Sequence, residues 1–362
     1  MTILLFIIVL GLVVLVHEWG HFFAARAFGI KVLEFGFGFP PRILGRKIGE
    51  TLYSMNLIPL GGFVKIYGES GEGEGDTFSF ISHPVWHRAV VIVAGVVMNV
   101  TLAWILFSVG HIIGIPALAE EGMPVHDARI TITNIAPESP AEEAKLAFGN
   151  IIREARVGGT AIAPKASAEL IDFVKAHMGE TLTLIIQSGA GSPPEDVKIV
   201  TITARSNPPP GQGPLGIALS DIGTLRSPWY RAPVEGLKTL WVSLAATFDA
   251  FLSLVRSAVV QHSIPEGVSG PLGLFALTSQ TTRLGISYFI QFVALLSVNL
   301  GILNILPFPA LDGGRLLFLA IEGIRGKALR MHHERLIHTI GFVLLLLLVI
   351  FVSFRDVQRF FL

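Results

Sequence analysis

Long apolar runs recur along the chain, and they have the length of membrane-spanning helices. A span needs about 20 mostly apolar residues, and four stretches reach that length: 3–25, 89–118, 284–311 and 336–354. The first lacks the basic start and the small-residue cleavage site of a signal peptide, so we expect it to be retained. The pattern therefore predicts a polytopic α-helical membrane protein with four transmembrane helices.

A fifth apolar stretch, residues 233–260, differs from these four. Its apolar residues recur at helical spacing, but charged side chains interrupt them, including Glu235, Lys238 and Asp249. This pattern is typical of an amphipathic helix that lies on a membrane surface or packs on a neighbouring domain. We expect residues 226–283 to form this interfacial helix and a linker, without crossing the membrane.

The stretch between the second and third predicted spans is polar and patterned like a folded domain. Short runs that alternate like strands, or repeat like a helix, are separated by turn-forming residues. These runs are 129–135, 166–178, 181–187 and 197–205. Residues 119–225 are therefore predicted to form a compact α+β domain inserted between the spans.

A second strand-like pattern lies in residues 50–69, between the first two spans. ETLYSMNL and FVKIYGE alternate in the manner of strands, and IPLGG between them contains glycines that permit a tight reversal. The pattern predicts a β-hairpin, with an ordinary surface hairpin as the alternative to a functional one.

Composition and charge narrow the class of protein. Charged residues make up only 15% of the chain, against about 25% in soluble domains, and the mean hydropathy is +0.64. Lys plus Arg and Asp plus Glu both number 27, so the chain lacks the basic surplus of a nucleic-acid-binding protein. With no cysteine, disulfides, thiolate metal sites and cysteine nucleophiles are excluded.

The distribution of basic residues predicts the orientation of the spans. Loops 26–88 and 312–335 are rich in lysine and arginine, so both are expected to be cytoplasmic. The N-terminus and the inserted domain would then lie outside the cytoplasm.

The end of the first span carries a candidate metal site. His17-Glu18-Trp19-Gly20-His21 matches the H-E-x-x-H pattern, in which two histidines on one helix face bind zinc and the glutamate takes a proton from zinc-bound water. The alternative is a pair of buried structural histidines. Ionisable residues in a span favour the functional interpretation, because they are costly there.

A third ligand is expected from the end of the third span. Catalytic zinc takes about three protein ligands, and Asp312 ends an uncharged run that Pro307 and Pro309 interrupt. The alternative is a helix-end residue that pairs with Arg315. If residues 233–260 do not cross, His17 and Asp312 reach the same side of the membrane, so the four-span topology and the metal site support each other.

These motifs resemble the site-2 protease family of intramembrane zinc metalloproteases. The resemblance rests on HEWGH in the first span and NILPFPALDGGR near the end of the third. PLGGFVKIYGE at 59–69, AGVVMN at 94–99 and a single PDZ-like domain resemble the bacterial RseP-type members. The resemblance implies one zinc ion held by His17, His21 and Asp312, with Glu18 activating water.

The resemblance also implies roles in substrate binding. Asn304 matches a position that helps to hold substrate, and Asn99 matches an asparagine of the second span, for which a helix–helix hydrogen bond is an equal alternative. The resemblance further implies that the hairpin is associated with the membrane. Its Gly61, Gly62 and Phe63 would lie at a strand edge that captures unwound substrate by strand addition.

The inserted domain resembles a PDZ domain in the permuted order of bacterial proteases. It departs from the usual pattern at Lys145-Leu146 and Gly149-Asn150. The loop that binds a peptide carboxylate would be formed by Gly213, Leu215, Gly216 and Ile217. The alternative, which we favour, is a filter that excludes substrates with bulky outer domains.

Together these features predict the organisation and the activity. Residues 1–118 hold two spans with the HEWGH motif and the hairpin, and residues 284–362 hold the last two spans. We expect a zinc metalloendopeptidase of the bacterial inner membrane that cleaves pre-trimmed single-pass proteins, such as anti-sigma factors or remnant signal peptides, in or near their spans, with no nucleic-acid partner. The alternatives are a non-proteolytic PDZ scaffold with a structural zinc site, and a transporter.

Overall fold

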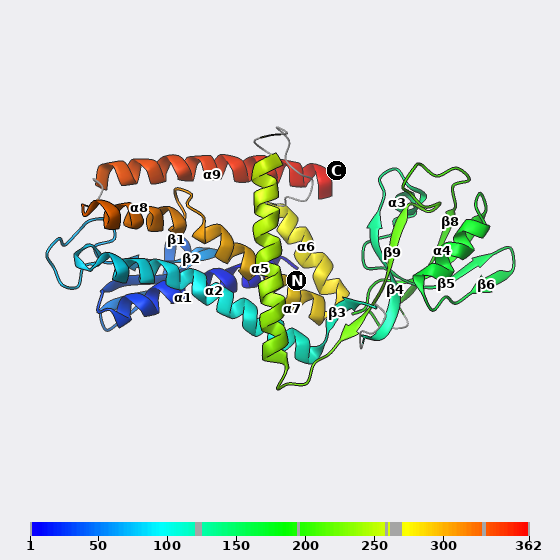
Figure 1. Ribbon diagram of the computed structural model, residues 1–362, viewed down its shortest axis with the longest axis horizontal. Helices are drawn as coiled ribbons and strands as arrows, with labels where there is room; N and C mark the ends of the chain where they lie inside the picture. Colours follow the sequence, from blue (N-terminus) through cyan, green and yellow to red (C-terminus); the bar gives the residue numbers. More distant parts are fainter. Residues whose placement is uncertain are drawn as a thin grey trace. The chain divides into compact units, whose positions relative to one another are not determined.

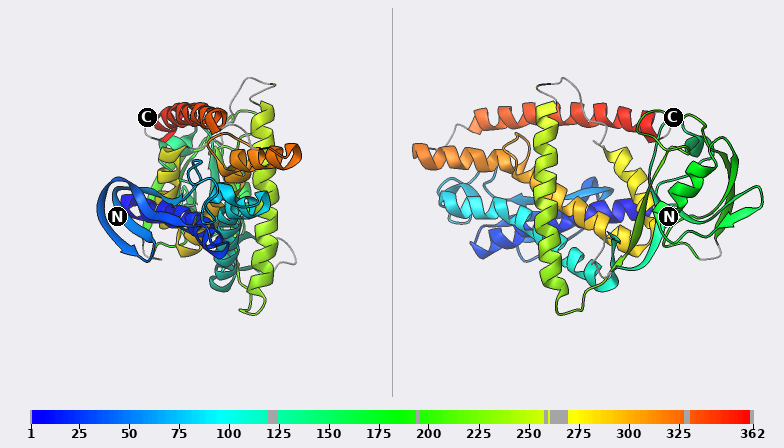
Figure 2. Two further views of the ribbon diagram at one scale, coloured as in Figure 1. Left: turned by 90° about the vertical axis from the view of Figure 1, so that its left-hand side faces the viewer. Right: turned by 45° about the vertical axis from the view of Figure 1, so that its right-hand side comes forward.

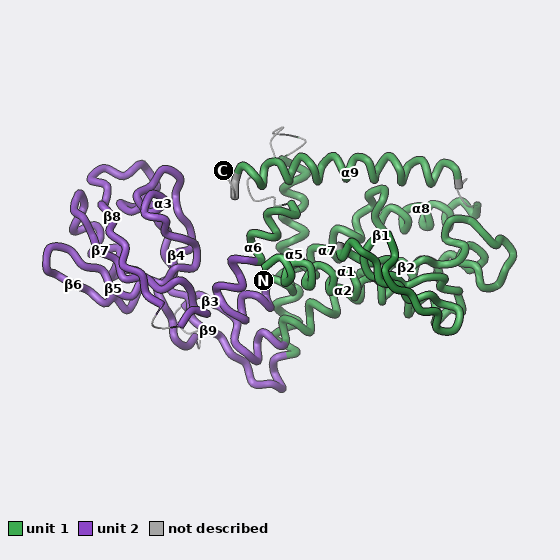
Figure 3. The backbone as a smooth tube through the Cα atoms, turned by 180° about the vertical axis from the view of Figure 1, so that it is seen from behind, with its two compact units in different colours: residues 1–108, 233–278, 292–362 green, residues 109–232, 279–291 purple. Residues whose placement is uncertain are grey.

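The fold consists of two compact units. A computed structural model describes residues 2–119, 125–193, 196–257, 260, 270–327 and 331–360. The helical unit comprises residues 1–108, 233–278 and 292–362, and the sheet unit comprises residues 109–232 and 279–291 (Figure 3). We describe each unit by itself.

Long helices dominate the helical unit (Figure 1). Among the described residues, five helices are long and apolar enough to cross a membrane, where the sequence predicted four. They are α1 (Thr2–Ala27), α2 (Val85–Ile113), α5 (Ala232–Arg256), α7 (Ile286–Ile305) and α9 (Met331–Phe360). The additional helix is α5, and it is the least apolar of the five.

The direction of α5 separates it from the other long helices. It runs across α1, α2 and α9 in Figure 1, and across α9 again in the right-hand view of Figure 2. Shorter helices complete the unit, namely α6 (Pro271–Leu284), α8 (Asp312–Arg325) and a 3-10 turn at Phe80–Ser82. Of the predicted linker up to residue 283, residues 261–269 lie outside the described residues, and α6 occupies most of the rest.

The helices of this unit pack through apolar clusters and close backbone contacts. Phe107 of α2, Leu240 of α5 and Val298 of α7 belong to one buried cluster. A Cβ added at Gly20 of α1 would lie only 2.2 Å from the backbone oxygen of Ala94 in α2, so only glycine permits this approach. Small residues are the usual means of close helix contact in membranes.

The β-hairpin contains the predicted reversal and a further one before it. Strands β1 (Val32–Ile48) and β2 (Thr51–Ile66) are antiparallel, and the chain reverses at Gly49 and Glu50. The IPLGG segment lies within β2 and reverses the chain as predicted, because residues 52–55 run parallel to residues 34–37 of β1 and residues 62–65 run antiparallel to them. It carries the chain from one side of β1 to the other: residues 52–55 and 62–66 pair with opposite edges of the first half of β1.

The sheet unit is built on one antiparallel sheet. The strand order is β3-β9-β4-β5-β7-β8, with β6 paired to β5. The strands and helices are β3 (Ile115–Leu118), β4 (Val125–Ile135), α3 (Pro140–Glu143), β5 (Ile151–Val157), β6 (Thr160–Ile162), α4 (Ser167–Ala176), β7 (Thr181–Gln187), β8 (Val197–Thr203) and β9 (Ile217–Leu225). The strands predicted at 129–135, 181–187 and 197–205 fall on β4, β7 and β8, and the predicted helix falls on α4.

A buried core joins the sheet of this unit to α4. Its fully buried side chains include Leu170 of α4, Leu182 and Leu184 of β7, and Ile132 of β4. Leu170 and Val174 lie one turn apart and face this core, as the helical spacing predicts.

Candidate metal centre

One face of α1 presents two histidines to the interior of the helical unit. His17 and His21 are one helical turn apart and are only 5% and 9% exposed. Their rings lie edge to face, with centroids 4.7 Å apart, and the two Nε2 atoms are 3.2 Å apart. Both Nε2 atoms are therefore directed to one point.

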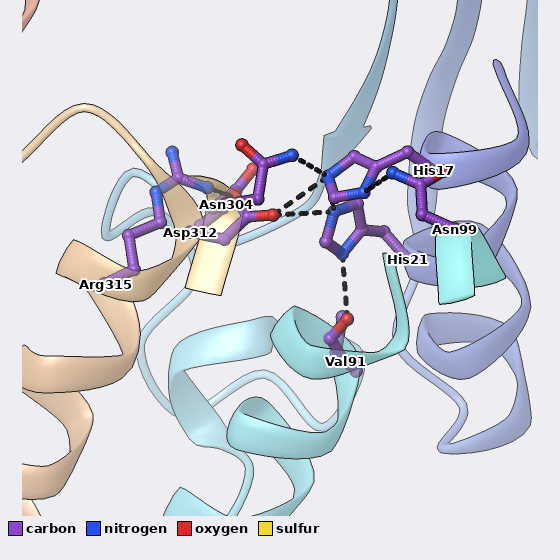
Figure 4. A network of polar contacts seen from close by, with 8 residues as sticks. His17, His21, Val91, Asn99, Asn304, Asp312 and Arg315 are labelled. Atoms are coloured by element: carbon purple, nitrogen blue, oxygen red, sulfur yellow. Dashed lines mark hydrogen bonds and ion pairs between the residues drawn. The ribbon is translucent and has the colours of Figure 1, made fainter. Parts of the chain in front are cut away.

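Asp312 reaches that point from the other end of the chain. It is the first residue of α8, after the break that follows α7 at Ile305. Its Oδ2 lies 3.0 Å from His17 Nε2 and 3.3 Å from His21 Nε2 (Figure 4). Burial alone would raise the pKa of the Asp312 carboxyl, but the hydrogen bonds from the two histidines outweigh burial and hold that pKa below its usual range.

The three side chains fit a zinc ion. Their ligand atoms, two imidazole nitrogens and one carboxylate oxygen, all lie within 4.8 Å of one another. Three ligands of these types are the usual protein donors of catalytic zinc, which keeps a fourth position open. His21 Nδ1 donates to the backbone oxygen of Val91 at 2.8 Å, which leaves Nε2 free to bind the metal.

Close packing of α2 beneath the rings makes this arrangement possible. A Cβ added at Gly95 would lie 2.5 Å from His21 Nε2 and 2.7 Å from His17 Cε1, so a larger residue would displace both ligands. The sequence analysis missed Gly95 and Val91. The small residues of AGVVMN were the available signal, because they indicate where another backbone approaches.

Glu18 lies beside the ligands and faces a cavity. A cavity of about 180 Å³ is lined by Glu18, His21 and Asp312 together with Phe63 and Arg315, among others. Gly62 of β2 is close to Glu18, since a Cβ there would lie 3.5 Å from Glu18 Cγ. The structure thus brings two of the three predicted hairpin residues to the centre, and Gly61 is adjacent to them in β2.

Two ion pairs anchor α8 on the C-terminal side of Asp312. Arg315 forms an ion pair with Glu69, and both residues line the cavity beside Glu18. The pKa of Arg315 lies above its usual value: burial opposes the charge, but Glu69 and Asp312 outweigh it. Farther along, Glu322 accepts from both terminal nitrogens of Arg88 of α2. Arg315 therefore pairs with Glu69, and Asp312 is left to the histidines.

The remaining predicted residues divide between the two units. Asn304 Nδ2 lies 3.1 Å from His17 Nε2, and Asn99 Nδ2 lies 3.3 Å from His17 Nδ1 (Figure 4). Both asparagines thus adjoin the metal ligands. The predicted peptide loop, Gly213 to Gly216 with Ile217, lies in the sheet unit at the start of β9 and is not part of this centre.

Comparisons with known proteins agree with this geometry. The model of the family "Peptidase family M50" matches residues 5–348. A zinc metalloprotease RasP of Oceanobacillus iheyensis is 29% identical over 445 residues, covering 100% of both chains. The regulator of sigma-W protease RasP of Bacillus subtilis is 29% identical over 447 residues, covering 100% of this chain and 99% of its own.

A cyanobacterial relative is slightly closer in identity. The putative zinc metalloprotease all3971 of a Nostoc species is 32% identical over 373 residues, covering 99% of this chain and 96% of its own. With the apolar helices, these matches make the chain a multi-pass membrane protein of the bacterial type. They also confirm the family that the motifs predicted: the chain belongs to peptidase family M50 and is a zinc metallopeptidase.

Proposed function

We propose that the helical unit hydrolyses peptide bonds in or near the spans of single-pass membrane proteins, with His17, His21 and Asp312 as zinc ligands and Glu18 as the general base. One observation carries this proposal. Ligands 295 residues apart in the chain meet within hydrogen-bond distance, and Glu18 faces the same cavity. A structural site would instead be closed by a fourth ligand.

The chemistry divides between the metal and the protein. Bound zinc polarises the scissile carbonyl and lowers the pKa of a water to about 7. Glu18 takes the proton of the attacking water and then delivers it to the leaving amine nitrogen, so the peptide bond is exchanged for a carboxylate and an amine. Asn304, with its amide at the edge of the ligands, holds the substrate beside them.

The edge of β2 supports binding of an extended substrate. Residues 62–66 pair with β1 on one side, and among the described residues no other strand pairs with them. Gly62 and Phe63 of this run adjoin Glu18 and the cavity. A substrate added here as a strand has its backbone exposed to attack, whereas a helical peptide bond is enclosed by its own hydrogen bonds.

The four-span topology is retained in this proposal, with α5 as the interfacial helix. Two observations support it: α5 runs across α1, α2 and α9 (Figure 1), and its charged residues lie away from the face that Leu240 buries. With α5 excluded, the basic loops place the metal centre on the cytoplasmic side and the sheet unit outside the cytoplasm.

The sheet unit is assigned a PDZ-like fold that filters substrates. The glycine-containing loop before β9 and the position of α4 support this fold. Ser167 at the start of α4 donates to both carboxylate oxygens of Asp221 in β9, at 2.9 Å each. The name of the Bacillus subtilis relative, a regulator of sigma-W protease, supports substrates of the anti-sigma type.

A cleavage assay in membranes tests the proposal. A tagged single-pass substrate, already trimmed outside the cytoplasm, is co-expressed with the wild type and with Glu18→Gln, which keeps the shape of the side chain and removes the base. We expect a short cytoplasmic fragment from the wild type alone, with equal zinc content in both proteins. Equal cleavage by both would contradict the assignment of Glu18 and favour a PDZ scaffold.

A further inference from the structure

Asn99 lies at the junction of three helices behind the metal ligands. Its side chain is 0% exposed, and its amide faces His17 across the α1–α2 contact (Figure 4). Ser297 of α7 donates to the backbone oxygen of Asn99 at 2.8 Å. These contacts hold Asn99 against the imidazole ring of His17. Because Asn99 is fully buried, an incoming peptide cannot contact it.

The two ligand histidines are held in different ways. A neutral imidazole carries one hydrogen, so the partner of one ring nitrogen decides the state of the other. His21 Nδ1 faces a backbone oxygen, which only accepts, so Nδ1 keeps its hydrogen whether or not a metal is bound. His17 Nδ1 faces a side-chain amide, which has both a donor and an acceptor.

In the metal-free arrangement, the amide nitrogen of Asn99 donates to His17 Nδ1. The ring hydrogen then lies on Nε2, which donates to Asp312 Oδ2 at 3.0 Å. The Asn304 amide nitrogen, 3.1 Å from the same Nε2, is in this state a neighbour and not a donor to it. A metal ion that binds at Nε2 requires this hydrogen to move to Nδ1. Nδ1 then needs an acceptor in place of a donor.

The carbonyl oxygen of the same side chain is available for this purpose. Oδ1 of Asn99 is buried, and within the described parts of the chain it has no hydrogen-bond partner. A half-turn of the amide exchanges Oδ1 and Nδ2, so that Oδ1 accepts from the Nδ1 hydrogen. An amide can serve both forms of His17 in this way, whereas a carboxylate only accepts and leucine does neither.

We propose that Asn99 is a positioning residue for His17, donating to Nδ1 in the metal-free centre and turning to accept from Nδ1 when zinc binds at Nε2. The inference rests on the proposed function, because it takes His17 as a zinc ligand. It assigns Asn99 to the metal centre and leaves substrate binding to other residues.

Zinc affinity of the purified full-length protein tests this role. We compare the wild type with Asn99→Leu, Asn99→Asp and a control, Asn299→Leu, by competition with a chelator. Asn299 is an exposed residue of α7. Its side-chain oxygen accepts from the Thr247 hydroxyl at 3.1 Å, and it makes no hydrogen bond to the described metal ligands. We expect Asn99→Leu to bind zinc about 10- to 100-fold more weakly, and Asn99→Asp and Asn299→Leu to stay within about threefold of the wild type.

A second measurement reports the ligand geometry directly. Cobalt(II) is loaded in place of zinc, and its visible absorption bands are recorded; we expect altered bands for Asn99→Leu and wild-type bands for Asn99→Asp. Wild-type affinity in Asn99→Leu, or an equal loss in Asn99→Leu and Asn99→Asp, would overturn the inference. If Asn99→Leu does not fold, Asn99→Ala replaces it with the same expectation.

One further variant separates this inference from the proposed function. His17→Ala is expected to lose zinc. If the wild type binds no zinc, or His17→Ala binds it as the wild type does, the proposed metal centre is wrong. If His17→Ala loses zinc while Asn99→Leu keeps it, only the role of Asn99 is wrong.

Discussion

Two groups of apolar helices in the same chain serve different purposes. About a third of the apolar window is buried in each of α1, α2 and α7, whereas the figures are 6% for α5 and 11% for α9. The first group contains the buried polar residues of the metal centre and the glycines that let the helices approach. The second group directs most of its apolar side chains outward. Apolar composition alone therefore says little about which helices form a site.

The largest effect is expected when a side chain is added at Gly95 of α2, where the helix backbone packs against the two histidine rings. Gly95→Ala places a Cβ where His21 Nε2 lies 2.5 Å away, so the rings must move. Zinc affinity should fall on the order of 100-fold, with loss of cleavage, as measured by chelator competition and the membrane assay. Gly301→Ala is the matched control, because its Cβ would meet Asn99 Cβ at an ordinary 3.7 Å; equal behaviour of the two variants would contradict this explanation.

A large loss of stability is expected when one partner of the buried Arg88–Glu322 pair is removed. The two side chains are 9% and 18% exposed, and Arg88→Leu leaves the Glu322 carboxylate unpaired. The free energy of unfolding should fall by about 3–5 kcal/mol, measured by denaturation in detergent. Adding Glu322→Leu should recover part of this loss. A double variant that is no more stable than Arg88→Leu alone would refute the charge explanation.

A matched pair of leucines tests the difference between buried and outward-facing positions. Leu240 of α5 is 4% exposed and belongs to the cluster with α2 and α7, whereas Leu346 of α9 is 48% exposed. Leu240→Ala should reduce the free energy of unfolding by about 2–5 kcal/mol, and Leu346→Ala by less than about 0.5 kcal/mol. Similar losses would show that α9 packs at Leu346 as tightly as α5 packs at Leu240.

The smallest effect is expected in the hairpin, outside both groups of helices. Gly61 has a φ of +104°, which is strained for any residue with a Cβ. Gly61→Ala should shift the edge of β2 and raise KM about fivefold, while zinc content stays unchanged. Gly49→Ala at the turn, with a φ of +62° and open space around it, should leave KM unchanged; a rise there would argue against an edge-specific role.

The candidate metal ligands were predictable because their chemistry is local and costly. Two histidines one turn apart in an apolar helix, and Asp312 at the end of another, have few structural reasons to be there. Gly95 and the backbone oxygen of Val91 were not predictable in the same way. Their role depends on which face of α2 meets α1, and that is decided by the packing of three helices.

The hairpin and α5 show two further limits of sequence patterns. Glycines at 61–62 indicated the reversal correctly, but not that residues 34–37 of β1 lie between the two runs that it joins. The strand Val32–Ile48 contains glycines and prolines that conceal its alternation. The length and composition of α5 lie between those of a span and those of an interfacial helix. The direction of α5 relative to the other long helices is therefore needed to distinguish the two.

The distance in sequence between His17 and Asp312 has a consequence during synthesis. The ribosome adds about 5–20 residues per second, so the 295 residues that separate these ligands take roughly 15 to 60 s to make. Throughout this interval the nascent chain contains the HEWGH motif in the bilayer without its carboxylate ligand. A chain released before residue 312 therefore lacks one of the three candidate ligands, and the centre can be completed only after Asp312 has been made.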